Sequence, residues 1–261
     1  NVKYKGRLEP GKMLLIDTAA QRIISDEELK ENVAGMYPYA EWNARHIVPL
    51  KELPAQQLPE GTETEDLIKL QKAFGYTFED ITKTIQPMGI QGVDPIGAMG
   101  MDSPLAVLST KPQMLYLYFK QLFAQVTNPP IDGIREEIIT SSSILLGDTG
   151  NLLDPDQRNS ASIYLEHPIL TNGELNRIKR LSPENNDKFK AVTLSILYKV
   201  AGGAKGMEKA LDKVFKEADK AISEGANIII LSDRGVNETV GPIPALLAAS
   251  GLHHHLIRKE I

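Results

Sequence analysis

The chain has 261 residues, of which 42% are hydrophobic and 24% charged, and its formal net charge is -5. This composition is typical of a globular protein with a sizeable core, and the negative charge without long basic runs argues against nucleic-acid binding. No apolar run reaches the roughly 20 residues that a membrane-spanning helix needs, and no signal region opens the chain.

Cysteine is absent from the sequence. Its absence excludes disulfides, thiolate metal sites, iron–sulfur ligation and cysteine nucleophiles within these residues. It also fits a protein of a reducing compartment, and we therefore predict a cytoplasmic location.

The first part of the chain predicts short elements joined by turns. Ser25, with Glu28 three residues later, has the pattern of a helix N-cap, and Thr77 with Asp80 repeats it. The expected elements are a hairpin over residues 1–25 with strands at Met13–Asp17 and Arg22–Ile24, a helix over Asp26–Ala34, an irregular connector over 36–59, a helix over Thr64–Phe74 and a short helix from Thr77.

The middle of the chain predicts loops and helices. We expect an irregular glycine-rich loop over Gln86–Ser103, because four glycines interrupt it. Apolar residues at helical spacing predict an amphipathic helix over Pro112–Ala124, and a second helix is expected over Ile134–Leu145. Thr171 with Glu174 marks one more capped helix, within Leu165–Ile178.

A stiff loop separates the two central helices. Its sequence, Gln125–Glu136, reads QVTNPPIDGIRE, and the tandem prolines Pro129 and Pro130 restrict the backbone of the residues around them. We expect Asp132 and Arg135 to brace the loop by pairing across one helical turn. Such a loop suits a fixed surface or lining better than a flexible linker.

The last third of the chain predicts a parallel α/β unit. Strands are expected at Lys190–Tyr198, Asn227–Ser232 and Leu252–Ile257, with helices over Met207–Glu224 and Pro244–Ser250, the first ended by Gly225. The predicted fold class is α/β: an incomplete β/α-barrel-like or Rossmann-like parallel sheet with helices on its faces, preceded by a small β-hairpin and a helix-rich segment. Because the third strand would leave an open edge, we expect the chain to be truncated at its C-terminus.

Two stretches of this unit are candidates for ligand binding. Gly202–Gly206 follows a strand and precedes a helix, so its amides could cradle a phosphate, but it lacks the spacing of either phosphate-loop fingerprint and also fits a tight turn. Ser232–Arg234 ends a parallel strand, where α/β folds place ligands. Asp233 either contacts such a ligand or caps the following turn and pairs with Arg234.

The remaining polar clusters are ambiguous. His253–His255 suggests a metal site, yet on a strand the middle histidine would point away from its neighbours, so polar packing is the competing interpretation. The acid pairs Glu136–Glu137 and Asp154–Asp156 suggest acid–base chemistry, but a helix start and a turn explain them equally. The sequence shows no complete active site and no metal site.

The chain resembles the large chain of glutamate synthase along its whole length. The motifs that carry the resemblance occur in the order GKMLLIDTAAQRIISDEELK, KLQKAFGYTFEDI, GAMGMDSPLAVLS, YFKQLFAQVTNPPIDGIREE, GNLLDP and LHHHLIR. The resemblance implies that residues 1–40 are the C-terminal end of a glutaminase (amidotransferase) domain with its connector, and that 41–261 form the glutamate synthase central domain.

The same resemblance implies a role without catalysis in these residues. In this family the glutaminase domain releases ammonia from glutamine, and a later domain with FMN and an iron–sulfur cluster uses it to make glutamate from 2-oxoglutarate. The central domain joins the two and helps wall the ammonia tunnel. The implied partners are these domains of the same chain and, in the full enzyme, a small NADPH-oxidising subunit or ferredoxin; no cofactor, nucleic acid or membrane is expected here.

The site prediction concerns the stiff loop. We expect Thr127, Asn128, Pro129 and Pro130 to form a tunnel or inter-domain wall, because uncharged side chains would neither protonate ammonia nor admit much water. A rigid inter-domain contact is the simpler interpretation. The alternative function is a self-sufficient α/β enzyme that binds a phosphate-containing ligand at Gly202–Gly206 and Asp233.

Overall fold

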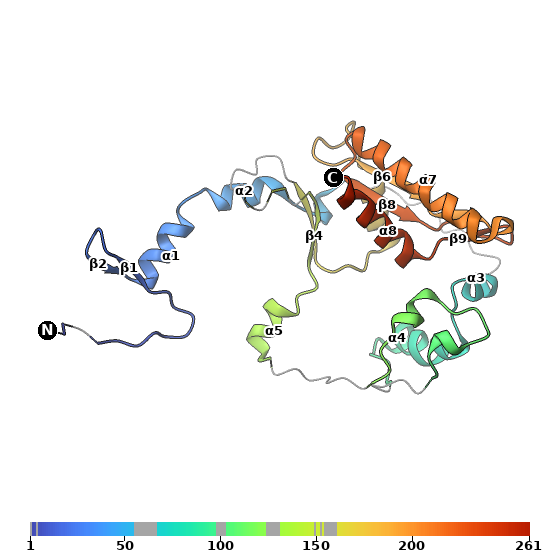
Figure 1. Cartoon of the computed structure of the whole chain (residues 1–261), viewed down its shortest axis with the longest axis horizontal. Helices are drawn as coiled ribbons and strands as arrows, with labels where there is room; N and C mark the ends of the chain where they lie inside the picture. The colour runs from blue at the N-terminus through green and yellow to red at the C-terminus, as the bar shows by residue number, and fades with distance from the viewer. Residues whose placement is uncertain are drawn as a thin grey trace.

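The computed structural model describes residues 2–3, 5–54, 67–97, 103–123, 131–148, 150–151, 153 and 161–261, apart from the side chain of Ile138. Figure 1 shows an elongated arrangement, with the N-terminal hairpin at one end and an α/β unit near the other. No helix in the described ranges is long and apolar enough to span a lipid bilayer.

The N-terminal hairpin and its helix form as predicted. Strand β1 (Leu15–Asp17) pairs antiparallel with β2 (Arg22–Ile24), and α1 (Asp26–Ala34) follows directly. The Ser25 hydroxyl accepts a hydrogen bond from the Glu28 amide at 3.2 Å, which confirms the predicted N-cap.

The connector is more ordered than the sequence predicted. Helix α2 (Tyr39–His46) runs into strand β3 (Ile47–Pro49) and the short 3-10 helix η1 (Leu50–Glu52). Leu50 and Leu53 are buried in a hydrophobic core, so the expectation of an irregular connector was wrong for this part. Although the segment is polar overall, its few apolar residues are adjacent in the sequence. A short strand at the edge of a sheet can form with only these few apolar residues.

A three-stranded sheet holds this connector. Strand β5 (Ser162–Leu165) lies at its centre, parallel to β3 and antiparallel to β4 (Ile144–Gly147). The register pairs Ile47 with Ser162 and Ile144 with Leu165. The predicted helix over Ile134–Leu145 was therefore too long: α5 (Gly133–Ile139) ends before a serine run, whose hydroxyls compete with helical hydrogen bonds, and β4 follows.

The stretch between β3 and β4 contains short helical pieces. They are α3 (Leu67–Ala73), a π-helical segment η2 (Asp80–Ile85), α4 (Gln86–Gln91), η3 (Ala106–Leu108) and η4 (Leu115–Phe119). The Thr77–Asp80 cap is confirmed, since the Asp80 amide donates to the Thr77 hydroxyl at 3.1 Å. The Asp80 carboxylate accepts from the Thr77 amide and hydroxyl in return, which lowers the pKa of that carboxyl.

Two predictions in this stretch were wrong. The loop over Gln86–Ser103 begins as a helix, because α4 continues the helix from η2 and only ends where Gly92 takes the left-handed conformation. In place of the Pro112–Ala124 helix the described residues form only one 3-10 segment. Aromatic residues dominate that segment, and they lose side-chain freedom in an α-helix.

The C-terminal unit contains two pairs of strands and two long helices. Strand β6 (Ala191–Ser195) is parallel to β8 (Ile228–Ser232), and β7 (Leu197–Lys199) is antiparallel to β9 (Val240–Pro242). Helix α7 (Gly203–Ser223) follows the 3-10 turn η5 (Val200–Gly202) and crosses back to β8, and α8 (Ala245–Arg258) packs against α7.

The predicted third strand, Leu252–Ile257, was wrong, because these residues belong to α8. Ala248, Leu252 and Leu256 recur at intervals of four and put one apolar side on α7, a helical pattern that outweighs the short strand-like run. The fold is thus mixed α/β with small sheets, and the described strands form no closed barrel.

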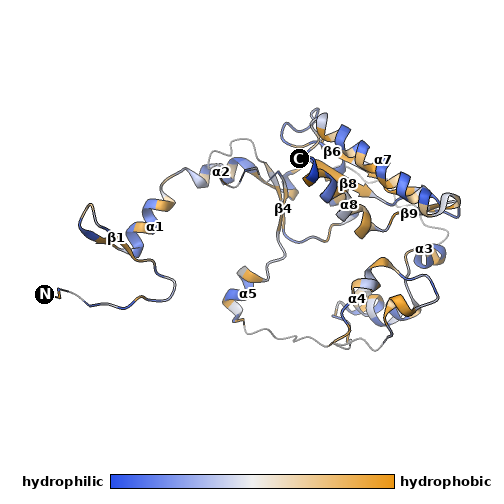
Figure 2. Ribbon diagram, viewed as in Figure 1, coloured by the Kyte–Doolittle hydropathy of each residue, from blue (hydrophilic) through white to orange (hydrophobic). Residues whose placement is uncertain are grey.

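Strand β8 separates two hydrophobic cores. Ile228 and Ile230 of β8 pack into a first core with the three-stranded sheet and helix α6 (Asn172–Lys179), whose predicted Thr171–Glu174 capping box is confirmed. Ile229 and Leu231 pack on the other face, into a second core with α7 and α8. This alternation is what a strand covered on both faces requires. In Figure 2, hydrophobic and hydrophilic residues alternate along α7, as expected of a helix with one buried side.

Candidate functional site

The carboxyl end of β8 forms a tight turn. The Ile196 amide donates to the Ser232 carbonyl at 2.9 Å, and the Ser232 hydroxyl accepts from the Arg234 amide at 3.4 Å. Ser232, and not Asp233, therefore caps the turn. The side chains of Asp233 and Arg234 are both described, and they form no ion pair with each other. Asp233 is half-buried at the end of the strand.

The loop between β8 and β9 is held by one side chain. The side-chain oxygen Oδ1 of Asn237 accepts hydrogen bonds from the Thr239 amide at 2.9 Å, the Thr239 hydroxyl at 2.8 Å and the Val240 amide at 3.1 Å. Gly235 precedes it with a φ of 101°, a conformation that favours glycine. The loop is thus a defined surface that presents Val236 and Glu238.

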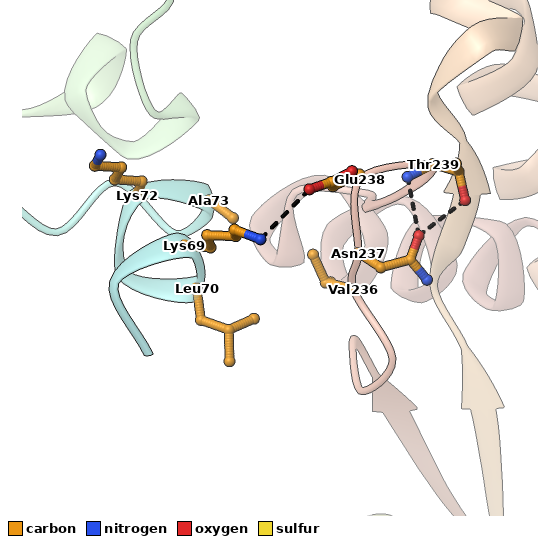
Figure 3. A pocket seen from close by; sticks show the side chains of 8 residues that line it. All are labelled: Lys69, Leu70, Lys72, Ala73, Val236, Asn237, Glu238 and Thr239. Carbon is orange, nitrogen blue, oxygen red and sulfur yellow. Dashed lines mark hydrogen bonds and ion pairs between the residues drawn. The ribbon is translucent and has the colours of Figure 1, made fainter. Parts of the chain in front are cut away.

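A groove of about 670 Å³ lies between this loop and α3. Figure 3 shows the Lys69 side chain reaching across toward Glu238, with an ammonium-to-carboxylate distance of 3.5 Å. Leu70 and Val236 line the gap below this ion pair, so its walls are largely apolar. The volume is in the range of ligand and peptide sites, but among the described residues no nucleophile with a neighbouring base lines it.

The glycine stretch Gly202–Gly206 is the start of a helix. Gly203 has a φ of 55° and opens α7, four residues earlier than the predicted start at Met207, and no described side chain caps the helix. Apart from the adjacent residues and the backbone of α7 itself, no described atom lies within 4 Å of the position that a Cβ on Gly202 or Gly203 would take, so these residues make no closed cradle with other described parts of the chain. This geometry supports the strand-to-helix turn over a phosphate site.

The three histidines lie on α8 and do not converge. His253 and His254 are exposed, while His255 faces α7 and its ring stacks on Phe215 with a centroid distance of 4.7 Å. His255 Nε2 lies 2.9 Å from a carboxylate oxygen of Asp219, and Lys259 donates to the other oxygen at 2.6 Å. Within the described ranges no group of three His, Cys, Asp or Glu could hold a metal ion. Polar packing is the role this geometry supports.

The contact around Asp219 gives a testable prediction. Replacing Asp219 with asparagine is expected to lower the free energy of unfolding at pH 7 by about 1–2 kcal/mol, because two charge-assisted hydrogen bonds between α7 and α8 weaken. The Lys259 ammonium, and after it His255, hold the pKa of the Asp219 carboxyl below its usual value. The stabilisation is therefore present above the ordinary carboxyl pKa and lost as pH falls through the depressed folded value.

Urea unfolding of both proteins at pH 7 and in acid, within the range where the fold persists, measures this effect. The difference in stability between them should shrink in acid. Asp212→Asn is the matched control, since Asp212 lies exposed on the same helix, and it should change stability little at either pH. An equal loss for both variants would contradict a specific role of Asp219.

The acidic residues at the start of α5 have ordinary structural roles. Asp132 caps α5 by accepting from the Ile134 and Arg135 amides at 3.1 and 2.9 Å. Its predicted pairing with Arg135 is confirmed, with a nitrogen–oxygen distance of 3.3 Å. Glu136 lies in the first turn of that helix, where the dipole favours a carboxylate. Asp154 and Asp156 lie outside the described residues.

The predicted wall residues also lie outside the described part of the chain. These residues are Thr127, Asn128, Pro129 and Pro130. The groove at Lys69 and the contact at Asp219 were both missed by sequence reasoning. For Asp219, the four-residue spacing of His255 and Lys259 places both side chains on one side of a helix. This spacing could have indicated a shared acidic partner if the segment had been predicted as a helix.

The described residues thus form a mixed α/β fold, and no catalytic arrangement is seen among them. Residues 69–261 match the family model of the glutamate synthase central domain, and residues 1–42 match that of the class-II glutamine amidotransferases. The chain belongs to the glutamate synthase central domain family, which confirms the resemblance drawn from its motifs.

Relatives match over the entire chain. It is 48% identical to the large chain of the NADPH glutamate synthase of Bacillus subtilis and 40% identical to ferredoxin-dependent glutamate synthase 2 of Synechocystis. It is 38% identical to the NADH glutamate synthase of Schizosaccharomyces pombe. The matches cover 100% of this chain but only 16%, 17% and 13% of these relatives, respectively.

Proposed function

We propose that this chain is the linking part of a glutamate synthase, which makes glutamate from glutamine and 2-oxoglutarate. The observation that carries the proposal is the order of the two family matches, an amidotransferase match at 1–42 followed by a central-domain match at 69–261. Under this proposal, one continuous stretch would join the end of a glutaminase domain to the central domain that precedes the synthase domain. We retain the boundary at residues 40 and 41 as part of the proposal.

The packing of the connector supports a rigid link. After α2, the chain enters the three-stranded sheet as β3, and Arg177 of α6 donates to the carbonyls of Lys51 and Leu53 at 3.0 and 3.2 Å. Lys188 donates to the Arg45 carbonyl at 2.7 Å. A linker held in this way would fix the direction in which a glutaminase domain leaves the central domain.

The proposed chemistry lies in other domains. The glutaminase domain would release ammonia, and a domain with FMN and an iron–sulfur cluster would use it, both within the same polypeptide. An NADPH-oxidising subunit or ferredoxin would supply electrons; the relatives include enzymes named for NADPH, NADH and ferredoxin, so this choice stays open. We also propose a cytoplasmic location. In addition, we propose that the β6–α7–β8 crossover is structurally related to an incomplete β/α-barrel or a Rossmann-like sheet.

The tunnel part of the proposal predicts a loss of coupling. In the longer enzyme, Thr127→Trp is expected to leave glutamine hydrolysis intact while most of the released ammonia escapes to solvent, because a bulky side chain would narrow the route. Parallel assays of glutamine-dependent and ammonia-dependent glutamate formation measure this. Only the glutamine-dependent rate should fall.

Thr140→Trp serves as the matched control. Thr140 is an exposed threonine at the end of α5, and its replacement should leave both rates unchanged. Unchanged coupling in Thr127→Trp would leave the loop as a rigid inter-domain contact. Absence of any glutamate formation by the unmodified longer chain would reject the linking function itself.

A further inference from the structure

A smaller cavity lies where two parallel strands end. Its lining comes from the carboxyl ends of β3 and β5, from η1 and from the start of α6, and the register pairs Pro49, the last residue of β3, with Tyr164. The carboxyl ends of parallel strands are where open α/β sheets hold ligands. The cavity measures about 260 Å³. This volume is just below that of sites for drug-sized ligands, so the cavity suits a smaller molecule.

Hydrogen bonds hold the walls of this cavity in place. Arg177 of α6 donates to the carbonyls of Lys51 and Leu53, so η1 is tied to the helix. The capping box fixes Glu174, whose Oε2 accepts hydrogen bonds from the amide and the hydroxyl of Thr171, both at 2.8 Å. A site whose walls are set in advance loses little conformational entropy when a ligand binds.

The cavity offers charges of both signs to a ligand. The other carboxylate oxygen of Glu174, Oε1, accepts no hydrogen bond from the described part of the chain. The hydrogen bonds from Thr171, and after them the charge of His167, hold the pKa of this carboxyl below its usual value, so it is ionised at neutral pH. Glu166 adds a second carboxylate. The Lys51 ammonium lines the same cavity, and within the described ranges it forms no hydrogen bond or ion pair.

The rest of the lining is largely apolar. Leu50 and Leu165 are buried in the first core, and Leu170 packs against that core. Leucine side chains neither donate nor accept hydrogen bonds, so a polar group placed on them would lose its bonds to water without replacement. This part of the cavity therefore favours a hydrocarbon group.

We propose that this cavity binds a small α-amino acid with an apolar side chain. The ammonium group of the ligand pairs with Oε1 of Glu174, its carboxylate pairs with Lys51, and its side chain lies on the leucines. A ligand with a single charge would leave one of these two protein groups partly desolvated and unpaired, so both ligand charges are needed. The inference is independent of the linking function. A ligand that contacts both η1 and α6 would also strengthen the packing of the connector.

Titration of the isotope-labelled chain with L-norvaline tests the proposal, with the dissociation constant taken from shifts of the backbone amide signals of Lys51, Leu165 and His167. Pentanoate lacks the ammonium group of L-norvaline and butylamine lacks its carboxylate, so they are the matched ligands. L-glutamine is a zwitterion of similar size with a polar end. We expect a Kd on the order of 1 mM for L-norvaline and binding roughly tenfold weaker, or less, for the other three.

Two variants locate the site. Glu174→Gln removes the charge but can keep the capping box, since glutamine also serves at this helix position. Lys51→Met removes the ammonium and keeps an apolar stem. Each is expected to weaken L-norvaline binding roughly tenfold, because one charge-assisted contact is lost. Glu208→Gln and Lys209→Met, at exposed positions of α7, are the matched controls and should bind like the unmodified chain.

Several results would overturn the proposal. These are the absence of a saturable shift with L-norvaline, shifts confined to other parts of the chain, and equal affinity for pentanoate or butylamine. An affinity for L-glutamine as high as that for L-norvaline would also overturn it, since the apolar lining would then select nothing. Circular dichroism of each variant distinguishes a lost contact from a lost fold, and the four ligands on the unmodified chain decide the question without any variant.

Discussion

Replacing Ile163 with alanine is expected to lower the free energy of unfolding by about 2–5 kcal/mol, the usual range for truncating a fully buried isoleucine. Ile163 is 0% exposed and lies on β5, between Val48 of β3 and Leu146 of β4 in the register of the sheet. Its side chain belongs to the core that also buries Leu50 and Phe189. The loss combines removed apolar contact with a cavity that strands on both sides prevent from collapsing.

Urea unfolding followed by circular dichroism measures this loss. Ile169→Ala is the matched control, because Ile169 is close in the sequence and 78% exposed, and it should change stability by less than about 0.5 kcal/mol. A similar effect of the two substitutions would mean that the three-stranded sheet does not form in the chain. The connector would then lose its anchor.

A second large effect is expected for Gly147→Ala, at the end of β4. A Cβ at this position would overlap the Ala161 carbonyl oxygen and lie 2.9 Å from the Ser162 Cα, and the backbone φ is 156°. Overpacking and backbone strain cost about 1–3 kcal/mol each, so we expect a loss of about 2–6 kcal/mol. The clash is with backbone atoms, which cannot rotate away as a side chain would.

The same substitution at Gly133 provides the contrast. Gly133 opens α5, and apart from its neighbours in the chain and the backbone of α5 no described atom lies within 4 Å of the position that an alanine methyl group would take there. Alanine at Gly133 should therefore be neutral or stabilising by up to about 1 kcal/mol. Unfolding curves of both variants against the unmodified chain measure the difference. Equal stability of Gly147→Ala and the unmodified chain would show that β4 leaves the sheet at Ser162.

Local signals in the sequence were read correctly. The caps at Ser25, Thr77 and Thr171 depend on residues three positions apart, so a short stretch contains the whole interaction. Gly225, with a φ of 90°, likewise ends α7 for a local reason. These features follow from backbone chemistry that no distant residue needs to complete.

Elements decided by distant partners were harder to predict. The run at Leu252–Ile257 reads equally well as a short strand, and packing of Ala248 and Leu252 against Val214 decides for the helix. Strand β3 was missed because its partner β5 follows more than a hundred residues later. The groove at Lys69 and Glu238 depends on a similarly distant pairing, and the expectation for Thr127 stays a prediction.

The register of β3 with β5 also has a consequence for the order of folding. Pro49 pairs with Tyr164 and Ile144 with Leu165, so the chain leaves the sheet and returns to it at the same end, about 10 Å apart across two strand spacings. During synthesis, β3 has no partner until β5 has left the ribosome. The two ends of the stretch between β3 and β4 are therefore adjacent, and a shorter connection could join these strands only if it kept Leu50 and Leu53, which are buried in the same core as the sheet.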